Sequence, residues 1–149
     1  MPLRLATVND IEAMHAVRLA VRENALSDAN GVRPEHYRTM LQEFGRGWVH
    51  EESGKVVAFG IADQAHRNIW ALFVVPGSEG RGIGSELLKV MVEWLFEQSG
   101  DTVWLTTGRN TRAEHFYNAA GWRAVGSAAD GEIRFELAAG DGRGTFNRD

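Results

Sequence analysis

The chain contains no cysteine, which excludes disulfide bonds, thiolate metal sites and a covalent cysteine intermediate. It also has no apolar run near the roughly 20 residues that a membrane-spanning helix needs. The first ten residues, MPLRLATVND, lack the apolar stretch and cleavage site of a signal peptide. With a formal charge of −4, the chain is not built mainly to bind nucleic acid. We therefore expect a cytoplasmic protein with no nucleic-acid or membrane partner.

The composition is that of a soluble globular protein. Of the 149 residues, 44% are hydrophobic and 24% are charged, which suits one domain with a single core. The five histidines (His15, His36, His50, His66 and His115) show no spacing typical of metal ligands. We therefore expect no metal site.

The hydrophobic pattern predicts a mixed α/β sheet in one domain. In chain order it indicates a strand, two helices, three strands, a helix, a strand, a helix and two strands. The domain is expected to span residues 1–139, and the apolar-poor tail 140–149 to fray. The run 69–75 is nearly all apolar and predicts a strand buried on both faces. The other strands are expected at 3–6, 48–51, 56–62, 102–106, 122–125 and 133–137, and apolar helix faces at 11–21, 34–44, 87–96 and 111–120.

A glycine-rich stretch, VPGSEGRGIGS, occupies residues 75–85 between the 69–75 strand and the following helix. The first N–H groups of a helix have no partner within it, and the helix dipole favours an anion there. Glycine allows the backbone to approach a ligand closely, and Arg81 adds a fixed positive charge. The stretch therefore predicts a phosphate site.

Two common phosphate-binding loops do not fit this stretch. A P-loop requires Gly-Lys-Ser or Gly-Lys-Thr, and neither occurs in the chain. A dinucleotide-binding loop requires a third glycine where Leu87 stands. It also requires an acidic residue after the next strand, which instead runs into residues 107–109 (Thr-Gly-Arg).

Two segments resemble the signatures of the GNAT N-acetyltransferase superfamily. Residues 79–84, EGRGIG, resemble its Q/R-x-x-G-x-G/A motif, and residues 110–122, NTRAEHFYNAAGW, are similar to its second motif, N-x-x-A-x-x-F-Y-x-x-x-G-F. The resemblance extends over about residues 3–138. One departure is Glu79, where the family has Gln or Arg. A carboxylate repels pyrophosphate, so we expect Glu79 to point to solvent or to pair with Arg81.

The resemblance implies acetyl-coenzyme A as co-substrate. Its pyrophosphate is expected on the backbone amides of residues 81–85, and its pantetheine arm along the preceding strand. The amide near Leu72 is expected to polarise the acetyl carbonyl. The cofactor-binding residues implied in this way are Leu72, Phe73, Val74, Arg81, Gly82, Ile83, Gly84, Ser85, Asn110 and Tyr117.

Tyr117 matches the family's general acid, which makes Tyr117 and the Leu72 amide the expected catalytic groups. A departing thiolate needs a proton, and a phenol, whose pKa of about 10 lies above the thiol's pKa of about 8.5, still carries its proton at neutral pH. Without cysteine, direct attack by a primary amine in a ternary complex is expected. The acceptor is a small-molecule or protein amine, expected near Asn24, Asp28 and Trp70.

The general base stays open at this stage. Some family members carry a glutamate four residues before the oxyanion amide, but this position is Asn68 here. Asp63, His66, Glu23 or a water molecule are the candidates. Because Asn68 cannot act as a base, a non-catalytic module of the same fold that senses acyl-CoA is the alternative interpretation. Since folds of this kind often pair, a homodimer is a further expectation.

Overall fold

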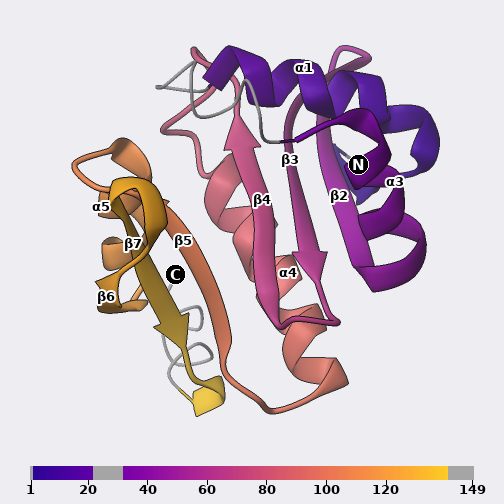
Figure 1. Ribbon diagram of the computed structural model, residues 1–149. Coiled ribbons are helices and arrows are strands. Elements are labelled where there is room, and N and C mark those ends of the chain that lie inside the picture. Colours follow the sequence, from indigo (N-terminus) through magenta and orange to yellow (C-terminus); the bar gives the residue numbers. More distant parts are fainter. Residues whose placement is uncertain (1, 22–31, 141–149) are drawn as a thin grey trace.

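The computed structural model describes residues 2–21 and 32–140, which form one mixed sheet with helices on both faces (Figure 1). The predicted fold class and order of strands and helices are confirmed. The tail predicted to fray lies, apart from Gly140, outside the described residues. The strands are β1 (Leu3–Leu5), β2 (Gly45–Glu52), β3 (Lys55–Asp63), β4 (Asn68–Val74), β5 (Val103–Gly108), β6 (Arg123–Ser127) and β7 (Glu132–Leu137). The α-helices are α1 (Ile11–Val21), α3 (Pro34–Thr39), α4 (Ile83–Gln98) and α5 (Arg112–Ala119). Three short segments of other helix types are the 3-10 helices η1 (Val8–Asp10) and η3 (Ala129–Gly131) and the π-helical η2 (Met40–Phe44), which continues α3.

The sheet has seven strands in the order β1-β2-β3-β4-β5-β7-β6. Neighbouring strands are antiparallel except β4 and β5, which are parallel and are connected through α4. A parallel connection requires such a crossover, and here the crossover helix follows the glycine-rich stretch. The topology therefore places the open end of α4 next to the carboxyl end of β4.

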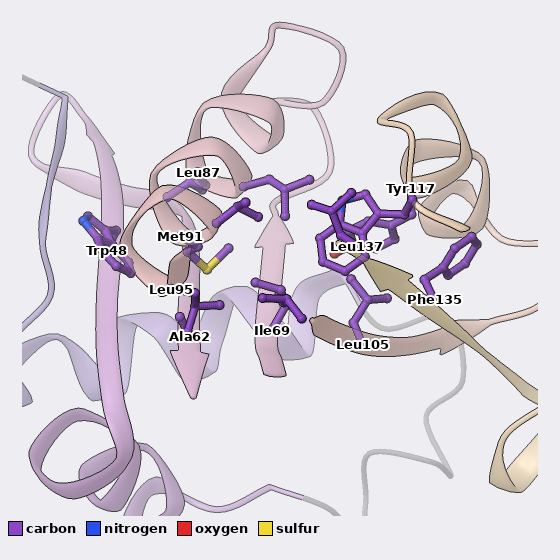
Figure 2. Close-up of a cluster of buried hydrophobic side chains, with 14 of the residues drawn as sticks. Trp48, Ala62, Ile69, Leu87, Met91, Leu95, Leu105, Tyr117, Phe135 and Leu137 are labelled. Carbon is purple, nitrogen blue, oxygen red and sulfur yellow. The ribbon is translucent and has the colours of Figure 1, made fainter. Parts of the chain in front are cut away.

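Two hydrophobic clusters hold the helices against the two faces of the sheet. On one face, α1 and α3 pack over Phe59, Ile61 and Ala71. On the other face, α4 supplies Leu87, Met91 and Leu95, together with residues of β3, β5 and β7 (Figure 2). Burying a Leu or Met side chain is worth about 1.5–3 kcal/mol, so each face contributes a large part of the folding free energy.

The prediction that the 69–75 strand is fully buried is wrong for most of its side chains. Ile69 and Ala71 are buried, whereas Trp70 and residues 72–75 are half-buried. The fully buried strand is β3, in which every residue from Val56 to Asp63 is buried. The difference arises because β3 has a full-length neighbour on each side, whereas β4 has one only toward β3.

Gly45 and Gly60 stand where an added Cβ would collide with a neighbouring atom. A Cβ at Gly60 would lie 2.6 Å from the Cε atom of Met91, and a Cβ at Gly45 would lie 1.7 Å from the backbone oxygen of Ala62. Gly45 follows the last residue of η2 and is the first residue of β2. The close approach at Gly60 lets α4 pack directly on β3.

No helix among the described residues has the length and apolar character to cross a membrane.

An ion-pair network fixes the start of α1. Arg4 donates to both oxygens of Asp10 at 2.9 Å and to both oxygens of Glu51 at 3.1 Å. The Oδ2 atom of Asp10 also accepts the backbone N–H of Thr7 at 2.8 Å, which caps the turn that precedes α1. These hydrogen bonds hold the pKa of the Asp10 carboxyl group below its usual value, and those from Arg4 have the largest effect.

This network predicts an acid-sensitive contribution to stability. Because the pKa of Asp10 is lower in the folded protein than in the unfolded chain, its contribution is present above about pH 4. It is lost as the pH falls further, through the folded-state pKa. Asp10→Asn is expected to lower the free energy of unfolding by about 1–2 kcal/mol at pH 7 and by less at pH 3. Urea denaturation at both pH values measures this, with the exposed Glu97→Gln as control. An equal loss at the two pH values would contradict it.

Candidate active site

The glycine-rich stretch ends at the open N-terminus of a long helix. Gly82 is the N-cap of α4 and has φ of +85°, a left-handed conformation that glycine adopts without strain. The N–H of Glu86 donates to the oxygen of Gly82 at 3.0 Å, which is the first hydrogen bond of the helix. The N–H groups of residues 83–85 precede that bond and therefore point out of the helix end. The start of α4 thus exposes unpaired backbone N–H groups, the feature on which the prediction of an anion site was based.

The parallel strands β4 and β5 are tied together at one end only. Their register contains the single pair Asn68 and Trp104. At this end Trp104 donates its backbone N–H to the oxygen of Arg67 at 3.0 Å and its indole N–H to the oxygen of His66 at 2.8 Å. The Nδ2 atom of Asn68 donates to the oxygen of Trp104 at 3.1 Å. Toward the carboxyl end of β4 the two strands diverge (Figure 1).

This divergence leaves backbone groups of β4 directed away from β3. The N–H of Val75 donates to the oxygen of Val57 at 2.9 Å, which marks Val75 as hydrogen-bonded to β3. Residues of an antiparallel pair alternate between hydrogen-bonded and non-hydrogen-bonded positions. Val74 and Leu72 therefore direct their N–H and C=O groups to the β5 side. Leu72 and Val74 are the residues of this strand whose backbone the family resemblance places against the pantetheine arm.

A β-bulge in β4 places Trp70 on the α1 and α3 face. In the β3–β4 register, Ile61 pairs with Ala71 and Ala62 pairs with Ile69, so Trp70 is the extra residue. Its ring packs edge-on against the buried Tyr37 of α3, with centroids 5.4 Å apart. Trp70 thus lies two residues before Leu72, on the face where the acceptor was expected.

Two further α1 side chains lie on this face, and sequence reasoning did not assign them. The Arg18 guanidinium carbon lies 4.8 Å from the ring centroid of Phe73 and 5.9 Å from that of Trp70. The Nδ1 atom of His15 lies 3.1 Å from the hydroxyl of Tyr37. Both residues lie far along the sequence from the aromatic rings that they contact, so no local pattern indicates these contacts. Asn24 and Asp28, predicted to contact the acceptor, lie outside the described residues.

Tyr117 sits at the α5 end of the α4-side cluster (Figure 2). Its ring centroid is 5.0 Å from that of Phe116, 5.7 Å from that of Trp122 and 5.9 Å from that of Phe135. Burial raises the pKa of the Tyr117 phenol well above its usual value. The hydroxyl therefore holds its proton throughout the physiological pH range, as a general acid must.

Asn110 stands in the turn between β5 and α5. It has φ of +59°, a left-handed conformation that asparagine tolerates better than most residues. Its backbone N–H donates to the Oε1 atom of Glu114 at 2.6 Å, and Thr111 caps the helix that follows. The Asn110 side chain is exposed at the end of the strand next to β4.

The charged residues of the glycine-rich stretch are arranged differently from expectation. Glu79 is exposed, as predicted, and its Oε1 atom accepts the N–H of Gly77 at 3.1 Å. The alternative pair with Arg81 is wrong. The Nη2 atom of Arg81 instead lies 2.8 and 2.7 Å from the two carboxylate oxygens of Glu52, at the end of β2. A partner 29 residues away leaves no local signal in the sequence.

Two of the candidate bases form a pair at the closed end of β4. Asp63 is buried and accepts the ring Nδ1 of His66 at 2.8 Å and its backbone N–H at 3.1 Å. Leu72 lies four residues beyond Asn68, about 13 Å along an extended strand. The pair is therefore remote from the backbone groups of Leu72 and Val74. Glu23 lies outside the described residues, in which no group of three or more potential metal ligands occurs.

The chain matches a model of the acetyltransferase (GNAT) family over residues 13–122, which includes the glycine-rich stretch, β4 and Tyr117. It is a member of the GNAT acetyltransferase family. A search of curated protein sequences gave no match to this GNAT protein.

Solved structures share the fold of this GNAT protein at low sequence identity. A GNAT acetyltransferase from Staphylococcus aureus Mu50 is 17% identical, with a TM-score of 0.77 over 92% of this chain and 98% of that one. The ribosomal-protein-S18-alanine N-acetyltransferase from Escherichia coli is 17% identical, with a TM-score of 0.74 over 92% of each chain. A ribosomal-protein-alanine N-acetyltransferase from Brucella melitensis is 17% identical, with a TM-score of 0.73 over 93% of this chain and 99% of that one.

The position of Glu79 predicts the effect of removing its charge. Glu79→Gln keeps an oxygen that can accept the Gly77 N–H, and it removes a negative charge beside the open end of α4. Acetyl-CoA is therefore expected to bind about 1.5- to 3-fold more tightly at low salt, and the difference to shrink at high salt. Isothermal titration calorimetry at two salt concentrations measures this. Weaker binding would mean that the carboxylate itself is needed to hold the loop.

Proposed function

We propose that this GNAT protein is an acetyl-CoA-dependent N-acetyltransferase that acts on a primary amine by direct attack in a ternary complex. The observation that carries the proposal is one juxtaposition. The open N-terminus of α4 stands beside an edge of β4, inside the sheet, whose backbone groups lack a neighbouring strand. Family membership and the resemblance to N-acetyltransferase structures support the same assignment.

The residues present fit acetyl-CoA. The N–H groups of residues 83–85 suit its pyrophosphate, because they converge at a helix end where the dipole favours an anion. Arg81 adds a guanidinium beside this end. Leu72 and Val74 offer N–H and C=O groups to the amides of the pantetheine arm, with Phe73 between them and Asn110 on the adjacent strand end. When bound, acetyl-CoA supplies an activated acetyl thioester.

Two groups of the chain have catalytic roles in this proposal. The N–H of Leu72 donates a hydrogen bond to the acetyl oxygen and stabilises the negative charge that develops there. Tyr117 holds a proton on its hydroxyl for the sulfur atom of the departing thiolate. Burial raises the pKa of Tyr117, so its hydroxyl carries this proton at neutral pH.

Proton removal from the amine is not assigned to a side chain. Asn68, at the position of the family's glutamate, is bonded to the oxygen of Trp104 and helps to close the end of β4 and β5. Asp63 and His66 lie near that same end, so a proton reaches them only through intervening water. The acceptor lies on the α1 and α3 face, beside Trp70, and is a small-molecule or protein amine.

The proposal is tested by following free thiol while the protein is incubated with acetyl-CoA and a panel of amines. The panel spans polyamines, aminoglycosides, amino acids and peptides with a free N-terminus. Thiol release that depends on both acetyl-CoA and one class of amine is expected. If acetyl-CoA binds tightly but no amine causes release, the chain is an acyl-CoA-sensing module and the catalytic proposal fails.

Tyr117→Phe separates catalysis from binding. The variant keeps the ring that packs against Phe116, Trp122 and Phe135 and removes only the hydroxyl. The turnover number is expected to fall by about 100-fold or more, while the affinity for acetyl-CoA and the melting temperature stay nearly unchanged. Steady-state kinetics and calorimetry on the same preparation measure both. Unchanged turnover would remove Tyr117 from the mechanism.

A further inference from the structure

A chain of ionisable side chains connects β2 to the glycine-rich stretch and to α4. Glu52, at the end of β2, accepts Arg81 at 2.7 and 2.8 Å. Behind it on the same strand is the buried His50, whose Nε2 atom lies 3.5 Å from the Oε2 atom of Glu52. The Nδ1 atom of His50 lies 3.6 Å from the Oε1 atom of Glu86, in the first turn of α4. Arg81, Glu52, His50 and Glu86 form a cluster that lies along one side of the proposed phosphate site.

The charge balance of this cluster is unexpected for a site that binds phosphate. Glu52 and Glu86 stand near the open end of α4, and Glu79 lies in the loop before it. The hydrogen bonds from Arg81 lower the pKa of Glu52, so this carboxylate is ionised at neutral pH. As a bare charge it would repel phosphate. Its contribution to binding must therefore come through the residue that it contacts.

Glu52 holds Arg81 through a single nitrogen atom of its guanidinium group. Both hydrogen bonds to Glu52 use the Nη2 atom alone, and the Nε and Nη1 groups make no hydrogen bond within the part of the chain that the structure describes. The Arg81 side chain is half exposed, at 51%, so without Glu52 it would sample many rotamers. The ion pair with Glu52 therefore restricts the orientation of the guanidinium and leaves the N–H groups of Nε and Nη1 outside the pair.

We propose that Glu52 is a positioning residue, which holds Arg81 beside the N-terminus of α4 so that the remaining guanidinium N–H groups meet a phosphate of acyl-CoA. The buried ring of His50 lies between this carboxylate and that of Glu86 in α4. This inference rests on the proposed acetyl-CoA site. It predicts that the negative charge of Glu52 strengthens the binding of acyl-CoA, whereas electrostatic repulsion between a carboxylate and a phosphate would by itself weaken it.

The test compares Glu52→Gln with Glu79→Gln by calorimetric titration of coenzyme A. Both variants remove one negative charge near the same helix end, but only Glu52 contacts Arg81. Glu52→Gln is expected to weaken binding by about two- to fivefold, the range measured for exposed ion pairs, while Glu79→Gln tightens it. Glu52→Asp is expected to bind with intermediate affinity, and all three variants should melt within a few degrees of the wild type.

The coupling to Arg81 is measured with Arg81→Gln and the double variant. If Glu52 acts through Arg81, adding Glu52→Gln to Arg81→Gln weakens binding no further. Titration with dephospho-coenzyme A distinguishes the two phosphate sources. Loss of the Glu52 effect with this ligand assigns Arg81 to the 3′-phosphate, and its persistence assigns Arg81 to the pyrophosphate.

Two results would overturn the inference: tighter or unchanged binding by Glu52→Gln, or additive losses in the double variant. Because the readout is binding, it is independent of turnover. Weaker, non-additive binding without acetylation of any amine would leave this inference standing while the catalytic proposal fails. A wild-type protein that does not bind coenzyme A would overturn both.

Discussion

The separation of β4 from β5 is the constraint on which the rest of this structure depends. A strand in the middle of a sheet normally has both rows of backbone groups paired, and unpaired buried groups are costly. Here β4 and β5 pair at Asn68 and Trp104, and beyond this pair the two strands are no longer in register with each other. The unpaired row on β4 creates an internal strand edge. Such an edge accepts an extended, amide-containing molecule in place of a neighbouring strand.

The closed end of this divergence is held by Arg67. Its guanidinium donates to the backbone oxygens of Leu95, Ser99 and Asp101 at 2.6–2.8 Å, at the C-terminal end of α4. Its own backbone oxygen accepts the N–H of Trp104. One residue thus ties the end of α4 to the start of β4 and β5. With that end anchored, and with Gly60 allowing α4 to pack closely on β3, the other end of α4 lies beside the carboxyl end of β4.

Charges around the open end of α4 are organised by contacts between distant segments. The glycine-rich stretch supplies one arginine, and β2 supplies the carboxylate that holds it. On the opposite face of the sheet, the bulge at Trp70 brings an aromatic ring next to the arginine of α1. The two faces of β4 therefore differ in chemistry, one suited to phosphate and the other to the amine acceptor of the proposed reaction.

The sequence by itself determined the order of strands and helices, the open end of α4 and the helix that carries Tyr117. These features depend on residues close together in the chain, such as Gly82 before Ile83 or the apolar spacing of α4, so local patterns contain them. Only the tertiary structure decided the partner of Arg81, the bulge at Trp70 and the half-buried state of β4. Each of these depends on segments far apart in the chain, whose pairing leaves no periodicity. Glu79 and Arg81 are near in sequence and of opposite charge, yet the fold brings Glu52 closer.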